Sequence, residues 1–198
     1  MHFDRLTLER AFVKIGQKAI QAGKLVEIAV YGGSALVLTL PGRVATRDVD
    51  AVFQGDAAWM RQTAVEIGNE CGWPADWLND AVKGFLSSKD HDSEAHRLFR
   101  TYPSEQQPGL RVFVASPRYL FAMKCLAMRI GGVDETQDRA DIESLARHIG
   151  VQDANEALTI VSEYYPHSRV SPKTRFGIEE IFGGTSSDAG MPTPSDKP

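Results

Sequence analysis

The feature that most constrains this chain is a Gly32-Gly33-Ser34 turn, followed after a short spacer by the acidic pair Asp48 and Asp50. A Gly-Gly turn that opens a short helix leaves backbone N–H groups free to bind a phosphate. Two aspartates at alternate positions of a strand point to the same face, where they can share metal ions. A phosphate-binding turn that precedes a metal-binding acid pair favours the chemistry of nucleotide transfer.

Composition sets broad limits on the class of protein. The 198 residues are 42% hydrophobic and 24% charged, as expected for one globular domain or a domain with a helical extension. The net charge of −4 gives no overall attraction to nucleic acid, although a local basic cluster could still provide one. The scattered cysteines and histidines argue against a structural zinc site.

The sequence also predicts where the protein works. The N-terminus lacks a signal pattern, and no apolar run approaches the ~18 residues of a membrane span. We therefore expect a cytoplasmic protein that makes no membrane contact.

Hydrophobic periodicity predicts an α+β fold, with a small mixed β-sheet core flanked by helices and a helical C-terminal half. The strands are expected at residues 26–31, 48–53 and 110–114, with a polar loop over 87–107 that contains one short strand near 97–101. The helices are expected at residues 7–22, 34–40, 57–71, 76–86, 117–130, 135–148, 154–164 and 172–181.

These elements divide the chain into three expected parts. Residues 1–115 form the core, and residues 116–182 form a helical C-terminal subdomain that packs on it. Residues 183–198 are rich in Gly, Ser and Pro and are expected to be a disordered tail.

The Gly-Gly-Ser turn and the acid pair each allow a functional and a purely structural interpretation. Gly32 and Gly33 could simply end a strand, or they could cradle a phosphate with Ser34 as both N-cap and phosphate ligand. Aspartate is disfavoured in strands, so Asp48 and Asp50 on one face favour a bound cation such as Mg²⁺. The alternative is a pair of exposed acids that interact with nearby arginines.

Further candidates lie outside these two motifs. Arg43, Thr46 and Arg47 could contact a triphosphate or could be ordinary loop residues. Lys124 lies in a helix that is apolar nearly all round, so a buried ammonium there should meet a carboxylate or a phosphate unless it reaches solvent from the helix edge. Asp141 could orient Lys124 or add a third acid, or it could pair with an arginine on the helix surface.

The aromatic residues are interpreted as structural. Trp59, Trp73, Trp77 and Phe85 are expected to pack in the core or between helices and not to stack on a base. Arg111, on the strand at residues 110–114, is a further candidate to reach the site.

Together these motifs resemble the nucleotidyltransferase superfamily with the DNA polymerase β-like fold. Within it, the chain is most similar to the bacterial branch of AbiEii-type and MenT-like toxins, which carry Gly-Gly-[Ser/Thr]-Ala and then Arg-x-[Ser/Thr]-x-Asp-hydrophobic-Asp. The matching positions here are Gly32-Gly33-Ser34-Ala35, Thr46-Arg47-Asp48-Val49-Asp50, Lys124 and Asp141-Ile142.

The chain departs from the branch at two points. Val44 stands where the branch has its arginine, so Arg43 or Arg47 would have to substitute. The strand at residues 110–114 carries no carboxylate, whereas many superfamily members have a third acid on a later strand.

The resemblance implies transfer of a nucleoside monophosphate from a nucleoside triphosphate to an acceptor hydroxyl, with Mg²⁺ or Mn²⁺ as cofactor. It implies that Asp48 and Asp50 are catalytic metal ligands, that Lys124 and Asp141 complete the catalytic set, and that Gly32, Gly33, Ser34 and Arg47 bind the nucleotide. Known acceptors in this branch include tRNA ends, and a toxin of this kind would have a cognate antitoxin protein. Two rivals stay open: a non-catalytic nucleotide-binding or antitoxin-like module, and a transferase with a small, aminoglycoside-like acceptor.

Overall fold

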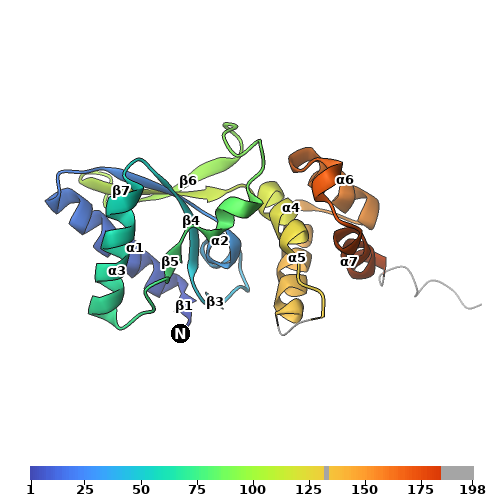
Figure 1. Ribbon diagram of the computed structural model, residues 1–198, viewed down its shortest axis with the longest axis horizontal. Helices are drawn as coiled ribbons and strands as arrows, with labels where there is room; N and C mark the ends of the chain where they lie inside the picture. Colours follow the sequence, from blue (N-terminus) through green and yellow to red (C-terminus); the bar gives the residue numbers. More distant parts are fainter. Residues whose placement is uncertain (132–133, 184–198) are drawn as a thin grey trace, which may run out of the picture.

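A mixed five-stranded sheet forms the centre of the computed structural model, which describes residues 1–131 and 134–183 (Figure 1). The strand order is β5-β4-β2-β7-β6, in which β2 lies antiparallel to β4 and parallel to β7. A separate two-stranded ribbon pairs β1 with β3. The strands are β1 (Phe3–Asp4), β2 (Val26–Val30), β3 (Ala45–Thr46), β4 (Val49–Gln54), β5 (Leu78–Asn79), β6 (His96–Pro103) and β7 (Pro108–Ala115).

The helices occupy two regions (Figure 1). Helices α1 and α3 pack together in the sheet half of the molecule, where α1 contacts β6 and β7, whereas α4 to α7 form the helical half. The helices are α1 (Arg5–Gln21), α2 (Gly32–Thr39), α3 (Ala57–Cys71), η1 (Ala81–Phe85), α4 (Pro117–Ala127), α5 (Glu135–Ile149), α6 (Ala154–Tyr164), η2 (His167–Arg169) and α7 (Pro172–Gly183). The expected α+β class is therefore confirmed.

The acidic strand shows how alternation places charged side chains beside the core. In β4, Val49, Ala51 and Phe53 are buried, whereas Asp50 and Val52 on the other face are half-buried. Asp48 immediately precedes the strand and is also half-buried. The period of two thus separates an apolar face from a face that can carry acids.

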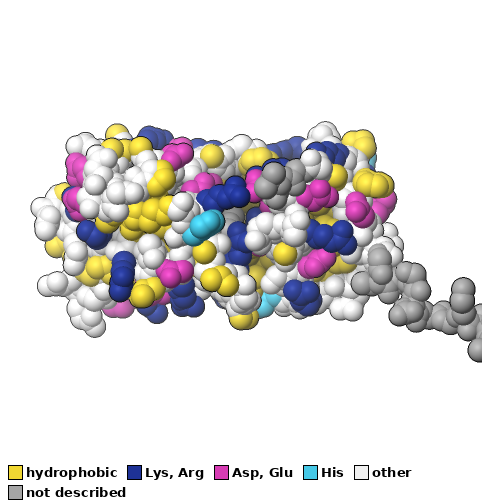
Figure 2. All heavy atoms as spheres, turned by 90° about the horizontal axis from the view of Figure 1, so that it is seen from below, with side chains coloured by type: hydrophobic (Ala, Val, Ile, Leu, Met, Phe, Trp, Pro, Cys, Tyr) yellow, Lys and Arg dark blue, Asp and Glu magenta, His cyan; other side chains and the backbone are white. Residues whose placement is uncertain are grey.

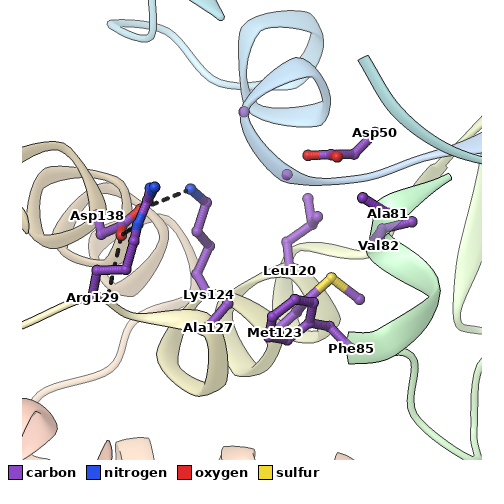
Figure 3. A pocket seen from close by; sticks show the side chains of 12 residues that line it. Asp50, Ala81, Val82, Phe85, Leu120, Met123, Lys124, Ala127, Arg129 and Asp138 are labelled. Carbon is purple, nitrogen blue, oxygen red and sulfur yellow. Dashed lines mark hydrogen bonds and ion pairs between the residues drawn. The ribbon is translucent and has the colours of Figure 1, made fainter. Parts of the chain in front are cut away.

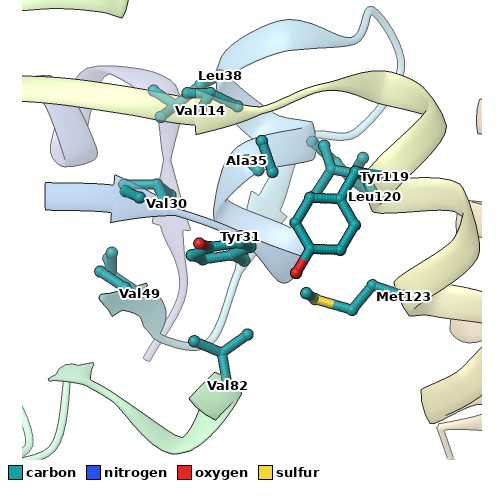
Figure 4. Close-up of a cluster of buried hydrophobic side chains, with 14 of the residues drawn as sticks. Val30, Tyr31, Ala35, Leu38, Val49, Val82, Val114, Tyr119, Leu120 and Met123 are labelled. Atoms are coloured by element: carbon teal, nitrogen blue, oxygen red, sulfur yellow. The ribbon is translucent and has the colours of Figure 1, made fainter. Parts of the chain in front are cut away.

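The core continues from the sheet into α4 without a break. Figure 4 shows Val30 and Val114 of the sheet beside Ala35 and Leu38 of α2. The ring of Tyr31 makes an edge contact with the ring of Tyr119 of α4, with 6.1 Å between the ring centres. Helix α4 has proline at its first turn, a position where the missing N–H costs nothing. It ends at Ala127, three residues earlier than its predicted end at residue 130.

Two sequence predictions are wrong between β4 and β7. The helix expected at residues 76–86 is instead the short strand β5, which pairs with the start of β4, followed by the 3₁₀ helix η1. The loop expected over 87–107 contains a full eight-residue edge strand, β6, which spans more than the short strand near 97–101. The ribbon β1–β3 was not predicted.

Of the tail predicted at 183–198, only Gly183 is described, as the last residue of α7, and residues 184–198 lie outside the described part. Within residues 1–131 and 134–183, no helix combines the length and apolar character needed to cross a membrane.

The crossing of α1 over the β6–β7 hairpin depends on glycine. A Cβ at Gly16 would lie 2.5 Å from the carbonyl oxygen of Tyr102, and a Cβ at Gly109 would lie 2.0 Å from the carbonyl oxygen of Gly16. These neighbours are backbone atoms, which cannot turn away as a side-chain end could. The two glycines therefore set how closely the helix approaches the sheet.

We expect Gly16→Ala to lower the free energy of unfolding by about 1–3 kcal/mol, because the overpacking outweighs the helix propensity gained. Urea denaturation measures this loss. Gly84→Ala is the matched control, since Gly84 has open space around its Cβ position. Equal stability of the two variants would contradict the close approach at Gly16.

Candidate functional site

The double glycine makes room for the acidic strand. Gly32 has a φ of +56°, and a Cβ there would lie 2.6 Å from Oδ2 of Asp50. A Cβ at Gly33 would lie 2.6 Å from Oγ1 of Thr46, on the segment that leads into the acid pair. The N–H of Tyr31 donates to the carbonyl oxygen of Asp50 at 2.9 Å. The turn and the acidic strand are thus one unit, in which each glycine removes a side chain that would collide.

Helix α2 begins at the turn, at Gly32, three residues earlier than an N-cap at Ser34 would require. Its N-cap is Tyr31, no side chain caps it, and its first N–H groups have no acceptor within the helix. The N-cap role predicted for Ser34 is therefore wrong. Ser34 is 1% exposed, and its hydroxyl donates to the carbonyl oxygen of Tyr31 at 2.9 Å.

Asp48 and Asp50 line one cleft together, as the alternation predicted. Asn79 of β5 donates to Oδ2 of Asp48 at 3.2 Å and so helps to orient that carboxylate. Burial, and then the neighbouring charge of Asp48, raise the pKa of Asp50 to about 6, while Lys124 acts in the opposite direction. The strand thus holds two acids in a setting that a cation would stabilise.

Lys124 and Asp141 form the buried ion pair that the apolar helix predicted. The Nζ of Lys124 lies 2.7 Å from Oδ2 of Asp141 and 3.5 Å from Oδ1 of Asp138. The Lys124 side chain is 15% exposed, and Asp141 is buried. The alternatives of a lysine extended into solvent and of a surface ion pair for Asp141 are therefore wrong.

The cluster extends through Asp138 to the edge of the cleft (Figure 3). Arg129 donates from Nε to Asp138 at 2.9 Å and from Nη1 to Asp134 at 2.7 Å. Burial alone would raise the pKa of Asp138, but the hydrogen bonds from Arg129 and the charge of Lys124 hold it below its ordinary value. Asp138 therefore stays ionised between two cations.

Two arginines precede the acid pair, and they occupy different positions. Arg43 is largely buried, with Nη1 lying 3.4 Å from Oδ1 of Asp141 and Nη2 close to the Cβ position of Gly33. Arg47 is 68% exposed and pairs with Asp134 at 3.0 Å. Val44 is exposed at 79%. Both arginines line the cleft, but Arg43 lies closer to the glycine turn.

Two adjoining cavities meet at Gly33, Asp50, Lys124, Arg129 and Asp138. The polar one, of about 630 Å³, also contains Asp48, Arg43, Arg47 and His2. The other, of about 350 Å³, lies between η1 and α4, where apolar side chains converge (Figure 3). Its apolar lining consists of Ala81, Val82, Phe85, Leu120, Met123 and Ala127.

Basic side chains gather on the molecular surface at the cleft. Figure 2 shows Lys and Arg side chains near the middle of the face seen from below, between the sheet half and the helical half. Exposed Arg129 and Arg47 lie at the polar cavity, and Asp134 bridges them.

The donor set suits a hard divalent cation that is shared with a ligand. Asp48 and Asp50 offer carboxylate oxygens, which Mg²⁺ and Mn²⁺ prefer, but among the described residues no group of three His, Cys, Asp or Glu side chains could hold a metal ion. Mg²⁺ commonly binds through one or two carboxylates and completes its shell with phosphates and water. The acid pair therefore fits a metal that arrives with a triphosphate.

Sequence reasoning missed several residues that the fold brings to the site. Asp138 lies one helical turn before Asp141, and this i,i+3 spacing could have indicated that it faces Lys124 too. Phe85, interpreted as a packing aromatic, is 41% exposed and lines the apolar cavity. Arg111 does not reach the site, because it pairs with Glu27 at 3.0 Å within the sheet.

Comparisons with known proteins identify a fold neighbour but no family. No family model and no curated protein matches the sequence. Among solved structures, the chain is similar to an antigenic nucleotidyltransferase-like protein from Paracoccidioides brasiliensis, with 15% identity, 90% of this chain and 95% of that chain covered, and a TM-score of 0.48. Similarity at this level assigns neither activity nor residue roles.

We expect Asp50→Asn to stabilise the metal-free protein near neutral pH. The pKa of Asp50 rises on folding from 3.8 to about 6, so the folded protein holds this proton more tightly than the unfolded chain does. The favourable contribution of the protonated carboxyl is therefore full below pH 3.8 and is lost as the pH rises through about 6. The substitution should therefore gain about 1–2 kcal/mol at about pH 7.5 and much less at about pH 4.5. Urea denaturation in a chelating buffer at both pH values measures the difference.

Asp80→Asn is a control of opposite sign. Hydrogen bonds from Lys83 and Arg61 hold the pKa of Asp80 at about 2, so its ionised form favours folding. Its substitution should destabilise the protein at the higher pH, and the effect should fade as pH falls. A pH-independent gain from Asp50→Asn would contradict the raised pKa.

Proposed function

We propose that this protein is a metal-dependent nucleotidyltransferase that moves a nucleoside monophosphate from a nucleoside triphosphate to an acceptor hydroxyl. The single observation that carries the proposal is the position of Asp48 and Asp50 against the Gly32-Gly33 turn, in a cleft that also contains Lys124. An adjoining apolar cavity supports the same function, because a nucleotide has one highly charged end and one flat, weakly polar end.

The charged end of the substrate belongs in the polar cavity. The free N–H groups at the start of α2, on Gly32, Gly33 and Ser34, are donors suited to phosphate oxygens. Lys124 and Arg43 supply positive charge beside the acid pair. Arg47 and Arg129, more exposed, suit the outer phosphates or an acceptor.

The nucleobase belongs in the apolar cavity. Phe85 offers an exposed ring, and Val82, Leu120 and Met123 provide apolar walls. The side chains of Arg129 and Asp138, at the boundary of the two cavities, already bind each other. Base recognition therefore relies on stacking and shape more than on hydrogen bonds from these walls.

Asp48 and Asp50 would hold one or two Mg²⁺ or Mn²⁺ ions together with the triphosphate. Bound there, the metal would neutralise phosphate charge and lower the pKa of a bound hydroxyl. Asn79 keeps Asp48 oriented, and the ion pairs of Asp141 and Asp138 keep the Lys124 ammonium in the cleft.

The reaction would exchange a phosphoanhydride bond of the triphosphate for a phosphodiester bond to the acceptor. The acceptor oxygen forms a bond to the α-phosphorus, the bond from that phosphorus to the bridging oxygen breaks, and pyrophosphate leaves with the bonding electrons. The proton of the acceptor hydroxyl passes to a carboxylate of the pair or to water. Lys124 and Arg43 stabilise the charge that accumulates on the leaving pyrophosphate.

The acceptor that we propose is the end of an RNA such as tRNA, which would make the protein toxin-like and leave room for a cognate antitoxin. The exposed arginines Arg47 and Arg129 at the cleft support this choice, since RNA binding uses cations that contact phosphates. A small hydroxyl-bearing acceptor, such as an aminoglycoside, is the alternative that the same assay tests.

The test is transfer of label from each of the four α-³²P nucleoside triphosphates in the presence of Mg²⁺ and total RNA, purified tRNA or an aminoglycoside. We expect labelled RNA with the wild type, and a loss of rate of at least about 100-fold for Asp48→Asn and for Asp50→Asn. Gel electrophoresis and thin-layer chromatography separate labelled RNA from labelled small products.

Asp92→Asn is the matched control, because Asp92 is an exposed acid away from the cavities. It should transfer label at the wild-type rate. Label on the aminoglycoside alone would move the acceptor to small molecules. Transfer that survives both site substitutions, or no transfer with any acceptor, would contradict the catalytic proposal and favour a binding module.

A further inference from the structure

We propose that Arg169, supported by Tyr165, is a positioning residue that holds the η1 wall of the nucleobase cavity in place without lining the cavity itself. This inference rests on the proposed function, because it assigns the apolar cavity to the base of a nucleotide. Arg169 is not among the described residues that line that cavity. It binds the carbonyl oxygens of Gly84 and Leu86, at the C-terminal end of the helix η1 that forms one wall of the cavity.

The cavity wall on one side is the short helix η1. Ala81, Val82 and Phe85 of η1 face Leu120 and Met123 of α4 across the cavity (Figure 3). A single 3₁₀ turn has weak internal hydrogen bonding, and the carbonyl groups at its C-terminal end lack partners within the helix. The position of this wall therefore depends on what binds those carbonyls.

Two side chains from the α6–η2 region bind three consecutive carbonyls at that end. Arg169 donates to the carbonyl oxygens of Gly84 at 2.7 Å and Leu86 at 2.8 Å. Tyr165 is buried, and its hydroxyl donates to the carbonyl oxygen of Phe85 at 2.7 Å. The guanidinium also lies over the Tyr165 ring, 5.1 Å from its centre. A cation is favourable at a helix C-terminus, so the arrangement both satisfies and fixes the end of η1.

The residues after η1 are fixed from the helical half as well. Ser87 donates from its hydroxyl to the carbonyl oxygen of Tyr164 at 2.5 Å, and its N–H donates to the hydroxyl of Tyr119 at 2.8 Å. Further along, Asp90 accepts a hydrogen bond from the hydroxyl of Tyr31 at 2.7 Å. Tyr31 is the N-cap of α2, so the same segment joins the helical half to the start of the glycine turn.

The position of Arg169 should affect the base end of the ligand and not its phosphate end. The phosphate end faces Asp48, Asp50 and Lys124, none of which Arg169 touches. The base end faces Val82 and Phe85 of η1, the helix whose C-terminal end Arg169 binds. Loss of Arg169 should therefore weaken binding of a nucleoside triphosphate and leave binding of inorganic tripolyphosphate unchanged.

The experiment compares two ligands by calorimetry in Mg²⁺ buffer. One is the nucleoside triphosphate, of the four common ones, that the wild type binds most tightly, and the other is inorganic tripolyphosphate. For Arg169→Ala we expect the Kd of the nucleotide to rise about 5- to 10-fold while the Kd of tripolyphosphate stays within about twofold. Arg169→Lys keeps the positive charge but loses the bidentate hydrogen bonding of the guanidinium, so its Kd for the nucleotide should lie between those of the wild type and Arg169→Ala.

Two further variants separate positioning from general stability. Arg118→Ala removes another exposed arginine, which pairs with Glu163 between α4 and α6 and has no hydrogen bond to residues 84–87. It should leave the ratio of the two Kd values unchanged. Tyr165→Phe removes the hydroxyl that donates to Phe85 and keeps the ring, so it should shift the ratio in the same direction as Arg169→Ala even if that variant folds poorly.

The outcomes distinguish this inference from the proposed function. A raised Kd for the nucleotide alone supports the role of Arg169. Equal ratios in the wild type, Arg169→Ala and Tyr165→Phe would overturn that role and leave the proposed function intact. Failure of the wild type to bind either ligand would overturn the proposed function, and this inference with it.

Discussion

The site depends on the close approach of the acidic strand to a turn without side chains. Asp50 occupies the space that a side chain at Gly32 would fill, and Thr46 does the same at Gly33. This contact explains why the two glycines, a positive φ and the acid pair occur together. It also places carboxylates beside the free N–H groups of α2, and the proposed binding of a triphosphate together with a metal ion rests on this arrangement.

Charge in the cleft is balanced across the boundary between the sheet half and the helical half. Lys124 of α4 and Arg43 from the loop after α2 both pair with Asp141 of α5, while Arg129 holds Asp138 and Asp134. Buried charges of this kind are costly unless they are paired. The ion pairs hold the lysine and the arginine next to the acid pair, so the helical half contributes side chains to the site together with the sheet half.

The parts of the fold that have a clear local sequence pattern could be predicted. The parts that depend on pairing between strands distant in the sequence could not. Strand β4 and the ion pair of Lys124 followed from alternation and from the cost of an unpaired buried charge. Residues 76–86 have apolar side chains at helical spacing, but pairing of Leu78 and Asn79 with β4 overrides that signal. Edge strand β6 leaves Arg97, Leu98 and Arg100 exposed, so its composition resembles a loop. Phe85 reaches the cavity because it lies at the end of η1, and nothing in the local sequence indicates this position.

The most direct test of the central claim is whether the acid pair binds metal and triphosphate jointly. Calorimetry with a non-hydrolysable nucleoside triphosphate, with and without Mg²⁺, measures this coupling in the wild type and in Asp48→Asn. The account predicts that Mg²⁺ lowers the Kd of the analogue by about tenfold or more in the wild type and has little effect in the variant. Binding that is equally tight without Mg²⁺, or a Mg²⁺ effect that survives in Asp48→Asn, would contradict it.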